Sequence, residues 1–228
     1  MAKNIHPLIQ LQGTLSDITF VNSHSYKPHV RAKRGSYKKA EINSSLAQQA
    51  NRTKLLNAVA KPVHDSLPIY CGQFKERQLW QKILQRLRQA PTNHPATLLQ
   101  QLIKLDINSK YPAEQLLPAI TLTQNKQELL VGLQTSMHPV FDLKQYDSYY
   151  YEAVVIFINR QLIPTHRSIS TEWIITRDAP PTFELAFTKP AGSVVFLLAL
   201  AVRAGYNSST VDVFKGMAMQ IVEAGAIS

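Results

Sequence analysis

Alternation of apolar and polar residues marks most of the C-terminal half of the chain. The alternating runs are rich in β-branched and aromatic residues, and Pro, Gly, Asn and Asp lie between them. A period of two is typical of strands, because successive side chains point to opposite faces of a sheet. We therefore expect strands at residues 119–124, 128–136, 149–159, 171–177, 182–188, 193–204 and 210–222.

One of these runs is apolar throughout. Residues 194–202 read VVFLLALAV. A membrane-spanning helix needs about 20 apolar residues, so this run is too short to be one. It predicts a central strand that is buried on both faces. Recurring short strands without long helices between them favour an antiparallel sandwich or barrel over residues 113–228.

A helical pattern replaces the alternation between residues 41 and 107. We expect helices at 41–60, 73–89 and 96–105. In the second helix, Trp80, Ile83, Leu84 and Leu87 recur at helical spacing and form one apolar stripe. The first helix is expected to end before Pro62, because proline lacks the N–H that a helix interior needs.

The first 40 residues show short alternating runs again, separated by Gly13, as in a hairpin or two strands of an extended arm. A further run, HVRAKR, predicts a strand with two unlike faces. His29, Arg31 and Lys33 would share one face, and Val30, Ala32 and Arg34 the other.

These patterns predict an α+β protein in three parts. Residues 1–40 form an extended basic N-terminal arm, residues 41–112 a small helical region, and residues 113–228 an antiparallel β-sandwich domain, Ig-like or jelly-roll-like.

The net charge of +10 lies in the first half of the chain. Residues 1–100 carry 15 Lys and Arg against 4 Asp and Glu, a net charge of +11, whereas the remaining residues carry 10 against 11. Such asymmetry indicates a basic face that meets nucleic acid, an anionic membrane or an acidic partner. A lysine-rich surface with no such partner is an equal alternative on charge alone.

Cysteine usage and the N-terminus bear on the compartment. Cys71 is the single cysteine, so no intrachain disulfide can form, which fits a reducing compartment. The first residues contain no long apolar stretch of the kind found in secretory signals. We expect a cytoplasmic protein without a transmembrane segment.

Few groups of residues in this sequence have the types and spacing that catalytic sites need. There is no nucleophile elbow, no pair of histidines with metal-ligand spacing, and no glycine pattern that would cradle a phosphate. His64-Asp65 is best explained by chance adjacency. Asp142, Asp147 and Glu152 more often border strands and loops than act as a catalytic pair. We therefore predict no enzymatic activity, no catalytic residues, no metal site and no cofactor.

The segment YKPHVRAKRGSYKK is the strongest candidate binding site. It interleaves cationic side chains with aromatic ones and contains no acidic residue. Cationic side chains contact phosphates, and tyrosines stack on unpaired bases. The same segment could instead lie on the acidic surface of another subunit. The candidate residues for nucleic-acid or partner binding are Tyr26, Lys27, Arg31, Lys33, Arg34, Tyr37, Lys38 and Lys39.

A short pattern in this part of the chain carries a resemblance. Gly13 precedes a short strand with Phe20, a polar turn follows, and then the pair Val30-Arg31 leads toward a helix. This order resembles the N-terminal third of an uncharacterised bacterial protein family of unknown function. The resemblance implies no catalytic residues. It implies that Arg31 belongs to a structural signature, which favours assembly over nucleic-acid binding.

The sequence therefore favours a non-enzymatic structural protein. We expect a subunit of a homo-oligomeric assembly, filament-, sheath- or capsid-like, that is held by its N-terminal arm and whose main partner is itself. The alternative is a nucleic-acid-binding protein, with DNA or RNA as partner, that uses the basic arm and the helix at 73–89.

Overall fold

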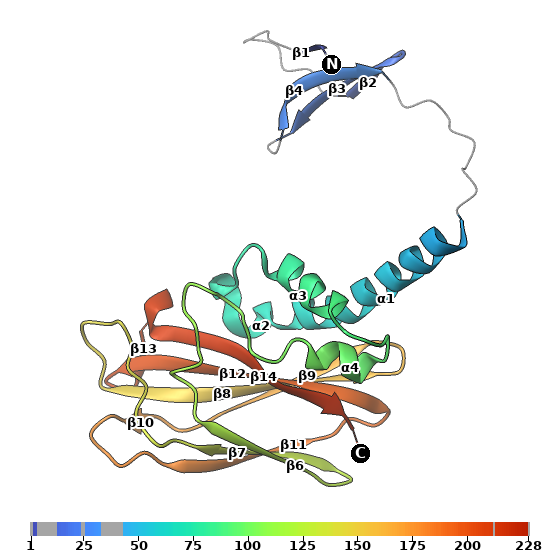
Figure 1. The fold of residues 1–228 in the computed structure, drawn as a ribbon. Helices are drawn as coiled ribbons and strands as arrows, with labels where there is room; N and C mark the ends of the chain where they lie inside the picture. The colour runs from blue at the N-terminus through green and yellow to red at the C-terminus, as the bar shows by residue number, and fades with distance from the viewer. Residues whose placement is uncertain (1, 4–12, 24–25, 33–42, 212, 228) are drawn as a thin grey trace. The chain divides into compact units, whose positions relative to one another are not determined.

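A computed structural model describes residues 2–3, 13–23, 26–32, 43–211 and 213–227 of the chain. The chain is mixed α and β with antiparallel sheets, and it divides into two compact units, Met1–Ala47 and Gln48–Ser228 (Figure 1). Within the described residues, no helix is both long and apolar enough to cross a membrane.

The first unit contains a four-stranded antiparallel sheet. Its strands are β1 (Ala2–Lys3), β2 (Gly13–Leu15), β3 (Ile18–Ser23) and β4 (Tyr26–Ala32), in the order β1-β4-β3-β2. A two-residue turn joins β2 to β3, and Ser16 in that turn has a positive φ of 52°. The strands that the alternation predicts in this region therefore pair with one another.

Helices occupy the next part of the chain. They are α1 (Ser44–Ser66), α2 (Pro68–Cys71), a 3-10 turn η1 (Gly72–Phe74), α3 (Leu79–Arg88) and α4 (Pro95–Gln100). The side-chain oxygen of Asn43 accepts a hydrogen bond from the backbone N–H of Leu46 and so caps α1. The predicted stripe of α3 is confirmed, because Ile83 and Leu87 are fully buried and Trp80 and Leu84 pack against the same core.

The prediction that the first helix ends before Pro62 is wrong, because α1 continues through this residue to Ser66. Pro62 is buried between Val59 and Val63, and their burial offsets the lost backbone hydrogen bond. The carbonyl left without its N–H partner is that of Ala58, an exposed residue where water can bind the oxygen.

The larger of the two sheets in the second unit is antiparallel. Its central order is β10-β8-β12-β14-β5, with β9 also paired to β8 and β13 to β12. Its strands are β5 (Leu105–Asp106), β8 (Ser148–Asn159), β9 (Pro164–Ser170), β10 (Ile174–Ile175), β12 (Ser193–Tyr206), β13 (Ser209–Thr210) and β14 (Met217–Ala226). A 3-10 turn, η2 (Phe214–Gly216), precedes β14.

The smaller sheet has three antiparallel strands in the order β11-β7-β6. They are β6 (Ala119–Gln124), β7 (Glu128–Gln134) and β11 (Thr182–Thr188). Figure 1 shows helices over one face of the larger sheet and the smaller sheet against its other face. The second unit is therefore built of three layers.

Strand β12 separates the two cores of this unit. Leu197 and Ala199 face the helices, whereas Phe196 and Leu198 face the smaller sheet. Residues 195–202 are each at most 2% exposed. The prediction of a central strand buried on both faces is confirmed.

Other strand predictions differ in their accuracy. Those at 119–124 and 182–188 are confirmed to the residue. The prediction at 171–177 is reduced to the two residues of β10, and the one at 210–222 is interrupted by η2. Strand β9 was not predicted, because it lies at a sheet edge and its sequence PTHRSIS is largely polar.

Candidate functional site

The basic segment predicted as the binding site is described only in part. Tyr26 and Lys27 lie at the start of β4, and Arg31 lies near its end with an exposed side chain. The remaining candidates, Lys33, Arg34, Tyr37, Lys38 and Lys39, lie outside the described residues.

Strand register gives the N-terminal sheet two unlike faces, since residues that pair directly across antiparallel strands point to the same side. Leu15 pairs with Ile18, Ile18 with Ala32, and Phe20 with Val30. These residues are all apolar and share one side, which we call the apolar face.

The opposite side is mainly polar. Thr14 pairs with Thr19, and Thr19 with Arg31, while Val21 pairs with His29. The hydroxyls of Thr14 and Thr19 lie 3.2 Å apart and share a hydrogen bond. The predicted separation of His29 and Arg31 from Val30 and Ala32 is thereby confirmed.

Three residues of the pattern behind the family resemblance lie side by side. Gly13 pairs with Phe20, and Phe20 pairs with Val30, so that they form one row across β2, β3 and β4. Gly13 has a φ of +121°, a conformation that residues with a side chain rarely adopt. Arg31, the fourth residue, projects to the opposite side. The pattern therefore describes the core of this small sheet.

Large apolar side chains on this face are exposed. Leu15 is 73% exposed and Ile18 46%, while Phe20 and Val30 are partly buried. Among the described residues of this unit, the strands form one layer, and no second layer covers its apolar side. Exposed apolar side chains that lie together on a surface are typical of interaction sites.

In the second unit, His64 and Asp65 belong to a small charged cluster on α1. The Nδ1 atom of His64 lies 3.1 Å from a carboxylate oxygen of Asp65, and Lys61 Nζ lies 2.6 Å from the other oxygen. The hydrogen bond from Lys61 is the main reason why the pKa of Asp65 is lowered. Lys75 lies 3.4 Å from His64 Nε2. Cations, rather than further metal ligands, therefore surround this pair.

The carboxylates of Asp142, Asp147 and Glu152 do not form one site. Asp142 pairs with Lys215 at 2.5 Å, and Glu152 lies 3.3 Å from Arg203. Asp147 accepts hydrogen bonds from the backbone N–H of Asn207 and the hydroxyl of Ser148, which lower its pKa. Each carboxylate stabilises a different part of the fold.

Cys71 is buried at the end of α2. Its thiol donates a hydrogen bond to the carbonyl of Leu67 at 3.2 Å. Burial raises the pKa of the thiol to about 11. Since the thiolate is the reactive form, this cysteine is not activated as a nucleophile.

A polar cluster that the sequence did not indicate joins α2 to the larger sheet. The guanidinium of Arg203 on β12 donates to the backbone carbonyl of Tyr70 and lies against Glu152 on β8. The hydroxyl of Tyr70 and Nδ1 of His166 on β9 share a hydrogen bond at 2.5 Å. Tyr70 and Arg203, the first and last residues of this cluster, are more than 130 positions apart in the sequence, so no local spacing could have revealed the cluster.

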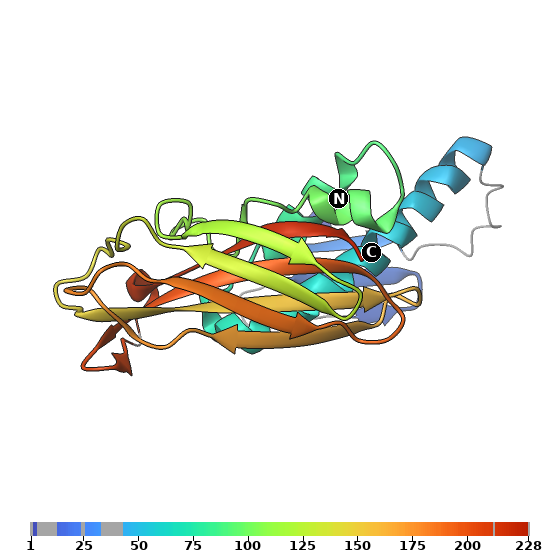
Figure 2. The ribbon, with the colours of Figure 1, turned by 90° about the horizontal axis from the view of Figure 1, so that it is seen from below.

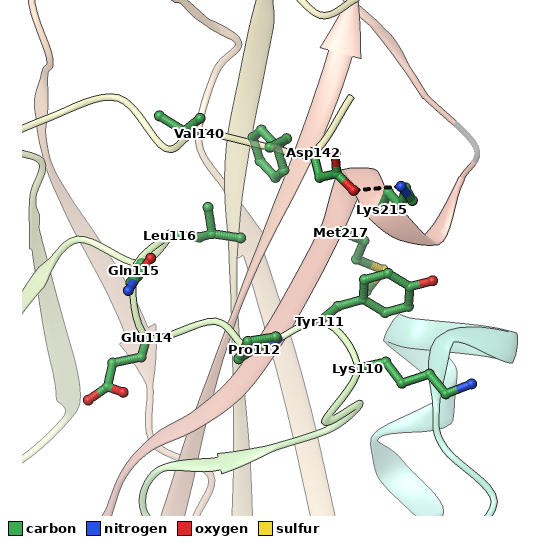
Figure 3. A pocket seen from close by; sticks show the side chains of 11 residues that line it. Lys110, Tyr111, Pro112, Glu114, Gln115, Leu116, Val140, Asp142, Lys215 and Met217 are labelled. Atoms are coloured by element: carbon green, nitrogen blue, oxygen red, sulfur yellow. Dashed lines mark hydrogen bonds and ion pairs between the residues drawn. The ribbon is translucent and has the colours of Figure 1, made fainter. Parts of the chain in front are cut away.

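A mainly apolar hollow lies beside β14 and has a volume of about 380 Å³. Leu116, Val140 and Met217 are among its lining residues, and the Asp142–Lys215 ion pair stands at its margin (Figure 3). The hydrogen bond from Lys215 occupies the carboxylate and raises the pKa of the lysine. This hollow offers apolar surface and no activated nucleophile.

Tyr149 and Tyr151 are core residues and not a stacking platform. They are 0% and 1% exposed, and their rings pack edge to face at 5.5 Å. Burial raises the pKa of Tyr151 to about 12. Tyr150 points to the other side and packs against Trp173.

Among the described residues, no three His, Cys, Asp or Glu side chains lie close enough together to hold a metal ion. Comparisons of the chain with known protein families, curated proteins and solved structures find no match.

Proposed function

We propose that this chain is a non-enzymatic structural subunit of a homo-oligomeric assembly, filament-, sheath- or capsid-like, in which the N-terminal unit binds a neighbouring copy. The observation that carries the proposal is the apolar face of the small N-terminal sheet, on which Leu15 is 73% and Ile18 46% exposed.

The size of the sheet supports this proposal. Its described strands contain two to seven residues each and form one layer. A single layer gains stability only when its apolar side is covered by another layer. A neighbouring subunit supplies that layer, and each large side chain that becomes fully buried contributes about 1.5–3 kcal/mol.

The second unit supplies the body of the subunit. Its two antiparallel sheets pack face to face, which supports a sandwich, and the Ig-like or jelly-roll-like assignment stays a prediction. The carboxylates of Asp142 and Glu152 and the thiol of Cys71 have structural partners, which supports a role without catalysis. The lone buried cysteine suits a reducing compartment such as the cytoplasm.

The alternative, binding of DNA or RNA, is favoured by one observation. Arg77, Arg86 and Arg88, in and just before α3, are exposed, as is Arg31 on the polar side of the N-terminal sheet. Arginines on a surface neutralise phosphates, and such binding weakens steeply with salt.

Light scattering coupled to gel filtration tests both functions, with absorbance read at 260 and 280 nm before and after nuclease treatment. We expect a nuclease-resistant oligomer with a protein-like absorbance ratio. Ile18→Lys places a charge on the apolar face and should weaken assembly at least tenfold. Thr19→Lys is the matched control, because the neighbouring residue points to the opposite side.

A chain that stays monomeric over a wide range of concentration and salt would contradict the assembly role. Retention of nucleic acid at low salt, lost on triple substitution of Arg31, Lys33 and Arg34 by alanine, would favour the alternative. Equal effects of Ile18→Lys and Thr19→Lys would show that the apolar face is not the contact.

A further inference from the structure

Strand β6 forms one edge of the smaller sheet. It pairs with β7 over all six of its residues without a register shift, and among the described residues no strand pairs with its other side. Figure 2, which views the molecule from the side of this sheet, shows β6 in yellow-green at the sheet's margin. Residues 119–123 are therefore able to pair with another strand along this edge, whereas the side chain of Gln124 donates to the carbonyl of Ala226.

The sequence of β6, AITLTQ, lacks the devices that normally block edge pairing. It contains no charge, no proline and no bulge. Strand β11 at the opposite edge differs, because it carries Glu184 at its centre. Pro118 precedes β6 and limits any added pairing to the strand itself.

The inward side chains of β6 are also incompletely covered. Ile120 and Leu122 pack against the core between the sheets but remain partly exposed. On β11, the residues in register with them are Phe183, which is also partly buried, and Leu185, which is 7% exposed. The apolar layer is therefore incompletely covered along β6, where a further strand would extend it.

We propose that β6 pairs antiparallel with β6 of a second copy around a two-fold axis, so that two three-stranded sheets become one continuous six-stranded sheet. This inference rests on the proposed assembly role and adds a second interface to it, distinct from the apolar face of the N-terminal sheet.

The strand is complementary to itself in side-chain pattern. When two copies of a strand pair antiparallel about a two-fold axis through one residue, each even-numbered residue lies opposite an even-numbered residue of the other copy. Each odd-numbered residue likewise lies opposite an odd-numbered one. Ile120 and Leu122 of both copies would then share the inward side, while Thr121 and Thr123 would share the outward side. Threonine pairs across strands are favourable, and apolar pairs would close the exposed end of the core.

Charge favours the same arrangement. An uncharged strand brings no repulsion to a two-fold axis.

Charge substitution at the centre of β6 tests the pairing in the full chain. Thr121→Lys and Thr121→Glu should each raise the dissociation constant of the β6 contact at least tenfold when the axis passes through residue 121 or 122, because like charges then lie close together across the axis. Mixing the two variants should restore association. Ala186→Lys and Ala186→Glu on β11 are the matched controls, since Ala186 is exposed on the same outward side.

Disulfide trapping provides a readout that does not depend on charge. A variant with Thr121→Cys and Thr123→Cys should form a cross-linked dimer under mild oxidation, whether the axis passes through residue 121, 122 or 123. Glu184→Cys with Ala186→Cys on β11 has the same spacing and should not. Native Cys71 is buried and does not compete.

Sedimentation velocity separates this interface from the proposed function. If Ile18→Lys reduces the assembly but the Thr121 variants do not, the β6 pairing is refuted and the assembly role stands. If the Thr121 variants reduce it and Ile18→Lys does not, β6 pairing stands and the N-terminal contact is refuted. Failure of the mixed Thr121 variants to associate, or cross-linking equal to that of the β11 control, would also overturn the β6 pairing.

Discussion

The ion pair between Glu152 and Arg203 allows a quantitative test of how the helical layer is held on the sheet. The two side chains are 14% and 21% exposed, and Arg203 also donates to the carbonyl of Tyr70 on α2. Exposed ion pairs contribute about 0–1 kcal/mol, whereas removal of one partner of a fully buried pair costs about 3–5 kcal/mol. The intermediate burial of this pair predicts that Glu152→Gln lowers the free energy of unfolding by about 2 kcal/mol.

Arg203→Met should cost about 1 kcal/mol more than Glu152→Gln, because it also removes the hydrogen bond to Tyr70. Urea unfolding followed by circular dichroism gives these free energies. In the double variant the two losses should not add, and a coupling energy of about 1–2 kcal/mol is expected. Lys215→Met is the control, since its pair with Asp142 is 55% and 86% exposed and should contribute much less than the pair of Glu152 and Arg203. Additivity within about 0.5 kcal/mol would refute the reasoning.

Three further predictions concern the core of the second unit. Leu198→Ala should cost about 2–5 kcal/mol in urea unfolding, because the side chain is 0% exposed and its loss leaves a cavity. The folded-state pKa of Cys71 is raised from 9.0 to about 11, so its contribution to stability is complete below pH 9 and is lost as the pH rises to about 11. That loss is on the order of 3 kcal/mol, and Cys71→Val should remove it from unfolding curves measured across this range. Gly205→Ala would place a Cβ 2.2 Å from the ring of Trp173, so it should displace the ring, lower the melting temperature and shift the tryptophan emission to longer wavelength.

The periodicity of apolar and polar residues predicted those strands and helices whose burial follows a regular pattern along the chain. Strand β12 has neighbours on both sides and layers on both faces, so its central residues 195–202 are all buried and this run is apolar throughout. Strand β9 has only β8 as a neighbour and mixes exposed with partly buried positions, which leaves too few apolar residues to reveal it. Burial explains both the success and the failure.

Tertiary packing decided the features that the sequence could not show. Pro62 predicts a helix end on local grounds, but the core over α1 stabilises the helix beyond it. Arg203 meets Tyr70 and Glu152 only after the sheet and α2 have packed together. The candidate basic segment was predicted from composition alone, and within it the structure describes the exposed side chain of Arg31.

The two proposed contacts differ in symmetry, and this has a consequence for the form of an assembly. If the apolar face of the N-terminal sheet binds a different surface of the next copy, repetition of this proposed contact produces a ring or an open filament. The β6 contact joins identical strands about a two-fold axis, so it relates copies that run in opposite directions. Together they predict stacked back-to-back rings or paired antiparallel filaments, with two-fold axes perpendicular to the ring axis or the fibre. Thr121→Glu should separate these into single rings or single polar filaments, and electron microscopy would distinguish the two forms directly.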